Sequence, residues 1–101
     1  MATRLITMRA GESIFIDFQK KDGATIDTDM TATYDLLDES DAVVSTGSLG
    51  KSGDLFTFEL RISGTTTATL SDGTYLLLVK VANDVTGYAD YIYEENVKIR
   101  S

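Results

Sequence analysis

The chain has 101 residues, 43% of them hydrophobic, and its nine Lys and Arg against sixteen Asp and Glu give a formal net charge of −7. This charge argues against nucleic acid as a partner, because phosphate binding needs a positive surface. The sequence has no His and no Cys, which removes the commonest general base, the commonest transition-metal ligand and any disulfide or thiolate metal site.

A chain of this length predicts a single domain over residues 1–101. The longest apolar run, residues 76–79, falls far short of the roughly 20 residues that cross a bilayer. The N-terminal residues lack the apolar stretch of a signal peptide. We therefore expect assembly in the cytoplasm where the chain is made, with no membrane partner.

Alternation of apolar and polar residues predicts β-strands along almost the whole chain, beginning with residues 4–8. The second strand, residues 12–18, directs three apolar side chains inward, namely Ile14, Ile16 and Phe18. After an Asp22-Gly23 turn, the third strand covers residues 30–36. An acidic hairpin turn at residues 38–42 then leads into a strand at 43–49.

The clearest alternation lies at residues 55–62, where four apolar side chains are expected inward: Phe56, Phe58, Leu60 and Ile62. The Thr-rich residues 63–70 are expected to form a crossover loop or a weak edge strand, and strands at 74–81 and 88–99 complete the chain. About seven strands with turns between them predict an all-β, immunoglobulin-like antiparallel β-sandwich. Because Pro is absent, its edge strands must be protected by charge, bulges or a partner.

Clusters of carboxylates are the feature that could suggest a site. Asp27 with Asp29, and Asp38 with Glu39 and Asp41, could supply oxygen ligands to Ca²⁺ or a glycosidase acid and base. The spacing of a calcium-binding loop is missing, and turns use the same residues to bind their own backbone. We therefore expect no enzymatic activity, no cofactor and no metal site.

The strand at residues 74–81 is apolar on both faces. Alternate residues from Tyr75 to Val81 form the inward face, but Leu76 and Leu78 fall on the face that should meet water. Either the N-terminal strand, with its apolar residues Leu5, Ile6 and Met8, covers them, or another chain does.

Late tyrosines suggest an interface as well. Tyr91 and Tyr93 are expected to share a strand face, with Ile92 on the opposite one, and one tyrosine among Tyr88, Tyr91 and Tyr93 to pack at a sheet corner. The residues predicted to form an interface are Leu76, Leu78, Tyr91, Ile92 and Tyr93.

Several stretches resemble the small immunoglobulin-like structural proteins of tailed bacteriophage virions, and are similar to the N-terminal domain of phage baseplate upper proteins. They are AGESIFIDF, KDGATID, TATYDLLDESDAVVSTGSL, LSDGTYLLLVKV and the closing NVKI. The resemblance implies a non-enzymatic neck or head-completion, tail or baseplate, or capsid decoration protein. It would form homo-oligomers and contact other virion proteins within the virion. The alternative is a carbohydrate- or cell-surface-binding module that uses the Tyr-rich face and the Thr-rich loops. A carboxylate-pair enzyme is a more remote one.

Overall fold

The computed structural model describes residues 5–19, 26, 29–83, 85–87 and 89–100. The Asp22-Gly23 turn, Asp27 and Tyr88 lie outside these residues. The secondary structure elements are β1 (Leu5–Arg9), β2 (Ile14–Gln19), β3 (Met30–Leu37), β4 (Val43–Ser48), β5 (Gly50–Lys51), β6 (Thr57–Ile62), α1 (Gly64–Thr67), β7 (Gly73–Asn83) and β8 (Ala89–Arg100).

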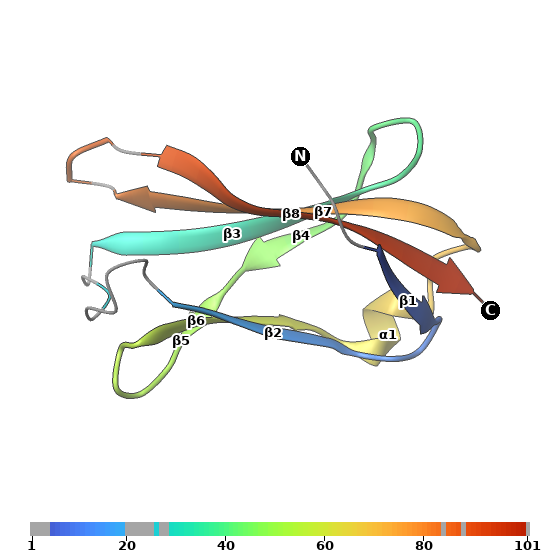
Figure 1. Cartoon of the computed structure of the whole chain (residues 1–101), viewed down its shortest axis with the longest axis horizontal. Helices are drawn as coiled ribbons and strands as arrows, with labels where there is room; N and C mark the ends of the chain where they lie inside the picture. The colour runs from blue at the N-terminus through green and yellow to red at the C-terminus, as the bar shows by residue number, and fades with distance from the viewer. Residues whose placement is uncertain (1–4, 20–25, 27–28, 84, 88, 101) are drawn as a thin grey trace.

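Two sheets face each other, which confirms the immunoglobulin-like β-sandwich (Figure 1). The larger is a 5-stranded sheet in the order β1-β8-β7-β3-β4, and the smaller is a 3-stranded sheet in the order β2-β6-β5. One pair departs from the expected antiparallel pattern, because β1 runs parallel to β8. The strands otherwise pair antiparallel within the described residues.

The core lies between the sheets and is built from alternate residues of their strands. Its fully buried side chains include Leu36, Leu60, Ile62, Leu77, Val79, Val97 and Ile99. In β6 the predicted inward face holds for Phe58, Leu60 and Ile62, which are all buried. The prediction is wrong for Phe56, which is 42% exposed, because the chain is still in the β5–β6 turn there and β6 begins only at Thr57.

The N-terminal strand does not cover Leu76 and Leu78. Because β1 lies beside β8 at the edge of the larger sheet, it extends that sheet and does not lie over β7. Its residue Met8 is buried and Ile6 packs against the core. Of the two covers considered for the leucines, β1 is therefore excluded.

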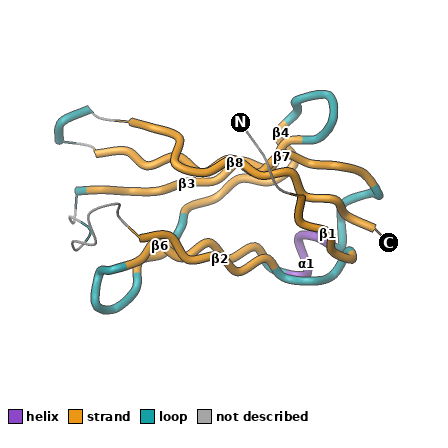
Figure 2. Tube along the Cα trace, viewed as in Figure 1, coloured by secondary structure: helices purple, strands orange, loops and turns teal. Residues whose placement is uncertain are grey.

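The Thr-rich crossover forms a short helix, α1, where a loop or edge strand was expected (Figure 2). Ser63 begins it, since the Ser63 hydroxyl accepts the N–H of Thr66 at 3.2 Å. Thr67 is fully buried, and its hydroxyl accepts the N–H of Gly11 at 3.0 Å and donates to the carbonyl of Glu12 at 2.7 Å. These bonds attach α1 to the β1–β2 turn.

The entry to β7 contains a tyrosine corner, a hallmark of immunoglobulin-like sandwiches. The hydroxyl of Tyr75, which is buried, donates to the carbonyl of Ser71 at 2.7 Å. Of the later tyrosines, Tyr93 packs against the core, and Tyr88 lies outside the described residues. The LSDGTY stretch forms this turn, so its residues indicate the fold of the chain.

Candidate functional site

Leu76 and Leu78 lie on the outer face of the larger sheet and are half-buried there. Leu37 stands directly opposite Leu76 on one side and directly opposite Val43 on the other. Residues paired in this way share a face and contact each other. The outer face therefore carries an apolar row across β4, β3 and β7, formed by Val43, Leu37 and Leu76. Leu76 and Leu78 are each partly covered by neighbouring residues of their own sheet.

A β-bulge in β8 separates the three predicted interface residues of that strand. The register pairs Val79 with Tyr93 and Lys80 with Tyr91, so Ile92 is the extra residue. Tyr91 consequently shares the outer face with Lys80, whereas Tyr93 lies on the core side with Val79. The prediction that Tyr91 and Tyr93 share a face is wrong, because the bulge interrupts the two-residue period.

Tyr93 is partly buried and packs against the core. Its ring meets that of Phe18 edge to face, with centroids 4.8 Å apart and an interplanar angle of 67°. Its hydroxyl donates to the carboxylate of Glu95, which is buried. Tyr91 and Ile92 differ from it, since 57% and 42% of their surfaces remain exposed.

The end of β2, the start of β3, the β5–β6 turn and the β7–β8 turn lie at one end of the sandwich (Figure 1). The ladders explain this arrangement, because Gln19 pairs with Thr57 in one sheet and Met30 pairs with Asn83 in the other. Ile26, within the β2–β3 connection, is buried and donates its N–H to the carbonyl of Leu55 at 2.6 Å.

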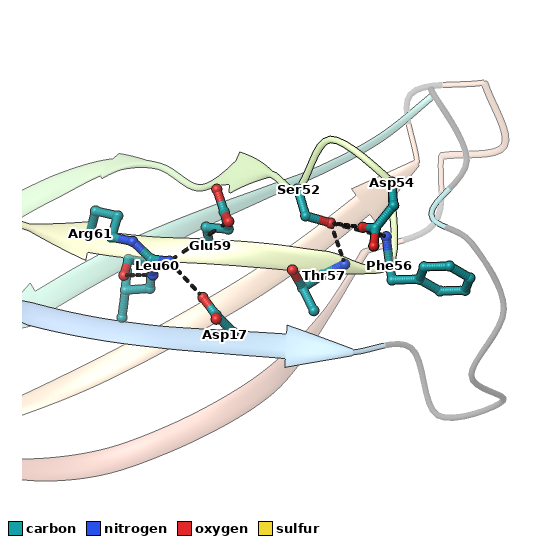
Figure 3. A network of polar contacts seen from close by, with 8 residues as sticks. All are labelled: Asp17, Ser52, Asp54, Phe56, Thr57, Glu59, Leu60 and Arg61. Atoms are coloured by element: carbon teal, nitrogen blue, oxygen red, sulfur yellow. Dashed lines mark hydrogen bonds and ion pairs between the residues drawn. The ribbon is translucent and has the colours of Figure 1, made fainter.

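The β5–β6 turn is held by Ser52 and Asp54 (Figure 3). The Ser52 hydroxyl donates to the Asp54 carboxylate at 2.6 Å and accepts the N–H groups of Phe56 and Thr57, each at 3.1 Å. The hydrogen bond from the Ser52 side chain, followed by that from the Phe56 N–H, lowers the pKa of Asp54. The turn therefore carries a fixed negative charge, and it directs the Phe56 ring beyond the start of β6.

The β7–β8 turn is held in a similar way by Asn83. Its side-chain oxygen accepts the N–H of Val85 at 3.0 Å and of Thr86 at 3.1 Å, and its carbonyl accepts the N–H of Gly87 at 2.9 Å. Val85 at the tip is 74% exposed. We call the exposed apolar residues of this end the loop-end surface: Phe56, Val85, Tyr91 and Ile92.

The outer face of the smaller sheet carries a different combination. The guanidinium of Arg61 binds the carboxylate of Asp17 at 2.9 Å (Figure 3). It also lies 4.7 Å from the centre of the Phe15 ring. Phe15 is 68% exposed. Phe15 therefore lies beside charged side chains, and an exposed ion pair of this kind contributes at most about 1 kcal/mol.

Two of the carboxylates singled out in the sequence, those of Asp38 and Glu39, accept main-chain N–H groups. The Asp38 carboxylate accepts the N–H of Ser40 at 2.9 Å, the Ser40 hydroxyl at 2.8 Å and the N–H of Ala42 at 3.0 Å. The Ser40 hydroxyl, more than the Ala42 N–H, lowers the pKa of Asp38. Asp41 has a φ of 65°, a conformation that Asp tolerates in turns. This is the structural role expected for Asp38.

Two shallow hollows occur at the opposite end of the sandwich. One, of about 380 Å³, is lined by residues of the β3–β4 hairpin and the start of β7, and the other, of about 390 Å³, by residues of β1, the β1–β2 turn and Arg100. Among the described residues, no three His, Cys, Asp or Glu side chains come together as a metal site. The described part of the chain also has no helix that is long and apolar enough to cross a membrane.

No family model matches the chain, and no curated protein matches it. Among solved structures it is similar to CopC from Methylosinus trichosporium OB3b, with a TM-score of 0.60 and 13% sequence identity, over 96% of this chain and 84% of that chain. At this identity the likeness shows a shared β-sandwich fold.

The structural comparison contradicts the predicted function. The likeness is to CopC, and it gives no link to a structural protein of a bacteriophage virion. The prediction failed because the stretches on which it rested are, where they are described, strands and turns of the sandwich. LSDGTY is the tyrosine corner, and the alternation around it is a property of the fold.

Proposed function

We propose that this chain is a non-catalytic protein-binding domain whose partner docks on the loop-end surface. The observation that carries the proposal is that two turns at one end, each fixed by a polar side chain, present exposed apolar residues. Ser52 holds the turn that presents Phe56, and Asn83 holds the turn that presents Val85. Exposed apolar residues that gather at one end of a domain are typical of an interaction site.

Pre-organisation favours binding at this end. A flexible loop loses conformational freedom when it binds, at about 0.5–1.5 kcal/mol for each side chain immobilised. The hydrogen bonds of Ser52, Asp54 and Asn83 already fix the main chain of both turns. Less conformational entropy is therefore lost when a partner covers Phe56 and Val85.

A strained residue supports the same location. Leu55 has a φ of 60°, which bulky residues rarely adopt and which costs about 1–2 kcal/mol. The conformation is held by the bond from Ile26 and by that from the Leu55 N–H to the Ser52 carbonyl at 2.9 Å. Strain of this kind gathers at functional sites, and here it lies next to Phe56.

Charge indicates the chemistry of the partner. Asp29, Asp54 and Asp90 are exposed at this end, and the pKa of Asp54 is held low by its turn. Within the described residues, Lys80 is the exposed cation beside Tyr91. We propose a protein partner with apolar side chains inside a basic rim, because complementary potentials steer such encounters.

Photo-crosslinking tests the proposal. A photoreactive phenylalanine analogue is placed at Val85, or at Phe15 as an equally exposed control on the smaller sheet, and the protein is irradiated in the cells that make it. We expect a discrete adduct with another protein from position 85 and none from position 15. Equal labelling at both positions, or none at 85, would overturn the proposal.

A further inference from the structure

We propose that a second copy of this chain pairs with the free edge of β4, so that the larger sheet continues from one copy into the next. The described sheets have free edges at β1, β4, β2 and β5. A free edge offers unpaired main-chain groups to any strand that approaches, and proteins normally block it with charge, with Pro or by making the strand short.

The edge of β4 lacks the protection that the other edges have. β5 is two residues long and includes Lys51, β2 carries Asp17 with its ion pair to Arg61, and β1 ends in Arg9. The sequence of β4, VVSTGS, contains neither a charge nor a Pro. Its residues Val43 and Val44 are 53% and 38% exposed.

The main-chain groups that face outward can be assigned from the ladder. Leu49 donates its N–H to the carbonyl of Ala32 at 2.9 Å, just beyond the pair formed by Thr33 and Ser48. Hydrogen-bonded pairs alternate along an antiparallel ladder, so Gly47 is also bonded to β3. Thr46 and Ser48 therefore present their N–H and C=O groups to the free edge. The bulge in this ladder lies between Leu36 and Leu37, toward the hairpin.

The absence of charged side chains from β4 allows a second copy to pair with this edge. Copies with a net charge of −7 repel each other, and like charges directly opposite across a ladder disfavour pairing. An uncharged strand that pairs antiparallel with itself brings no charges face to face. With a two-fold axis at Gly47, Thr46 of each copy pairs with Ser48 of the other and forms about four main-chain hydrogen bonds.

The pairing uses the second half of β4. With the axis at Gly47, residues 46–48 of the two copies lie side by side, while Val43 and Val44 lie toward the β3–β4 hairpin, outside the paired segment. This pairing involves no residue of the loop-end surface, so it stands or falls separately from the proposed function.

The mass in solution, measured by light scattering up to about 1 mM protein, tests the pairing together with a matched pair of variants. Ser48→Lys places a charge on the edge strand, and Thr31→Lys places the same charge at an exposed position of β3, one strand further in, opposite Ala82. We expect a wild-type dimer, a dissociation constant raised at least about tenfold by Ser48→Lys, and less than about a twofold change with Thr31→Lys. A wild-type monomer throughout, or equal effects of the two variants, would overturn the inference.

Amide hydrogen exchange provides a readout that needs no variant. In the dimer, Thr46 and Ser48 should become protected as concentration rises, whereas Gly47 should be protected at every concentration because it bonds to β3. Fast exchange at Thr46 and Ser48 in a dimeric sample would show that the copies meet elsewhere, and would equally overturn the proposal.

Discussion

Replacing Thr67 with Val tests how the crossover helix is fixed to the rest of the sandwich. The substitution keeps the shape of a fully buried side chain and removes its hydroxyl. Two long-range hydrogen bonds are lost, one from the Gly11 N–H at 3.0 Å and one to the Glu12 carbonyl at 2.7 Å. A Val side chain can replace neither of them.

The expected loss follows from the net value of such bonds. Each contributes about 1 kcal/mol, and a buried donor left without a partner costs about 1–3 kcal/mol. We therefore expect Thr67→Val to lower the free energy of unfolding by about 2 kcal/mol. For a domain of this size, that corresponds to a decrease in Tm of roughly 8–16 °C.

Urea unfolding followed by circular dichroism measures the effect, as a lower midpoint with an unchanged m-value. Thr67→Ser keeps the hydroxyl, and Thr65→Val makes the same exchange at an exposed position of α1. We expect Thr65→Val to stay within about 0.5 kcal/mol of wild type. A loss below about 0.5 kcal/mol for Thr67→Val, or one equal to that of Thr65→Val, would refute the reasoning.

Three further changes test other parts of the fold by the same unfolding assay. Tyr75→Phe should destabilise by about 1 kcal/mol, since the corner loses its 2.7 Å hydrogen bond, and no change would mean that this bond contributes nothing. Gly64→Ala should cost about 1–3 kcal/mol, because the new Cβ would lie 2.2 Å from a backbone oxygen of Gly11, and a neutral result would show that the turn moves freely. The hydrogen bonds that lower the pKa of Asp38 stabilise the folded state above about pH 4. This stabilisation is lost as the pH falls through the lowered pKa. Asp38→Asn should therefore be less stable than wild type at neutral pH and approach it in acid; a constant difference would contradict this.

The strands and their buried faces could be predicted from the sequence wherever apolar and polar residues alternate without interruption. In β6 the period of two identifies Phe58, Leu60 and Ile62 as core, and it fails only at Phe56, where the turn had not yet ended. The bulge at Ile92 could not be predicted from the sequence. One extra residue moves every later side chain of the strand to the other face without changing the composition.

Other features depended on contacts between distant segments. Thr-rich residues favour strands, so α1 was missed; its signals were Ser63 at the N-cap and the buried bonds of Thr67. The parallel position of β1 beside β8 also left no local trace. The loop-end residues Phe56 and Val85 could have been suspected from the turn formers Ser52, Asp54 and Asn83 beside them.

The affinity of the partner captured at Val85 tests the proposed function most directly. The purified partner is titrated calorimetrically against wild type, Tyr91→Ser/Ile92→Ser and the control Phe15→Ser. We predict that the double variant binds at least about tenfold more weakly, as expected when apolar anchors are removed, and that Phe15→Ser changes affinity less than about twofold. Unchanged affinity in the double variant, with loss in Phe15→Ser, would place the binding site on the smaller sheet and contradict the account.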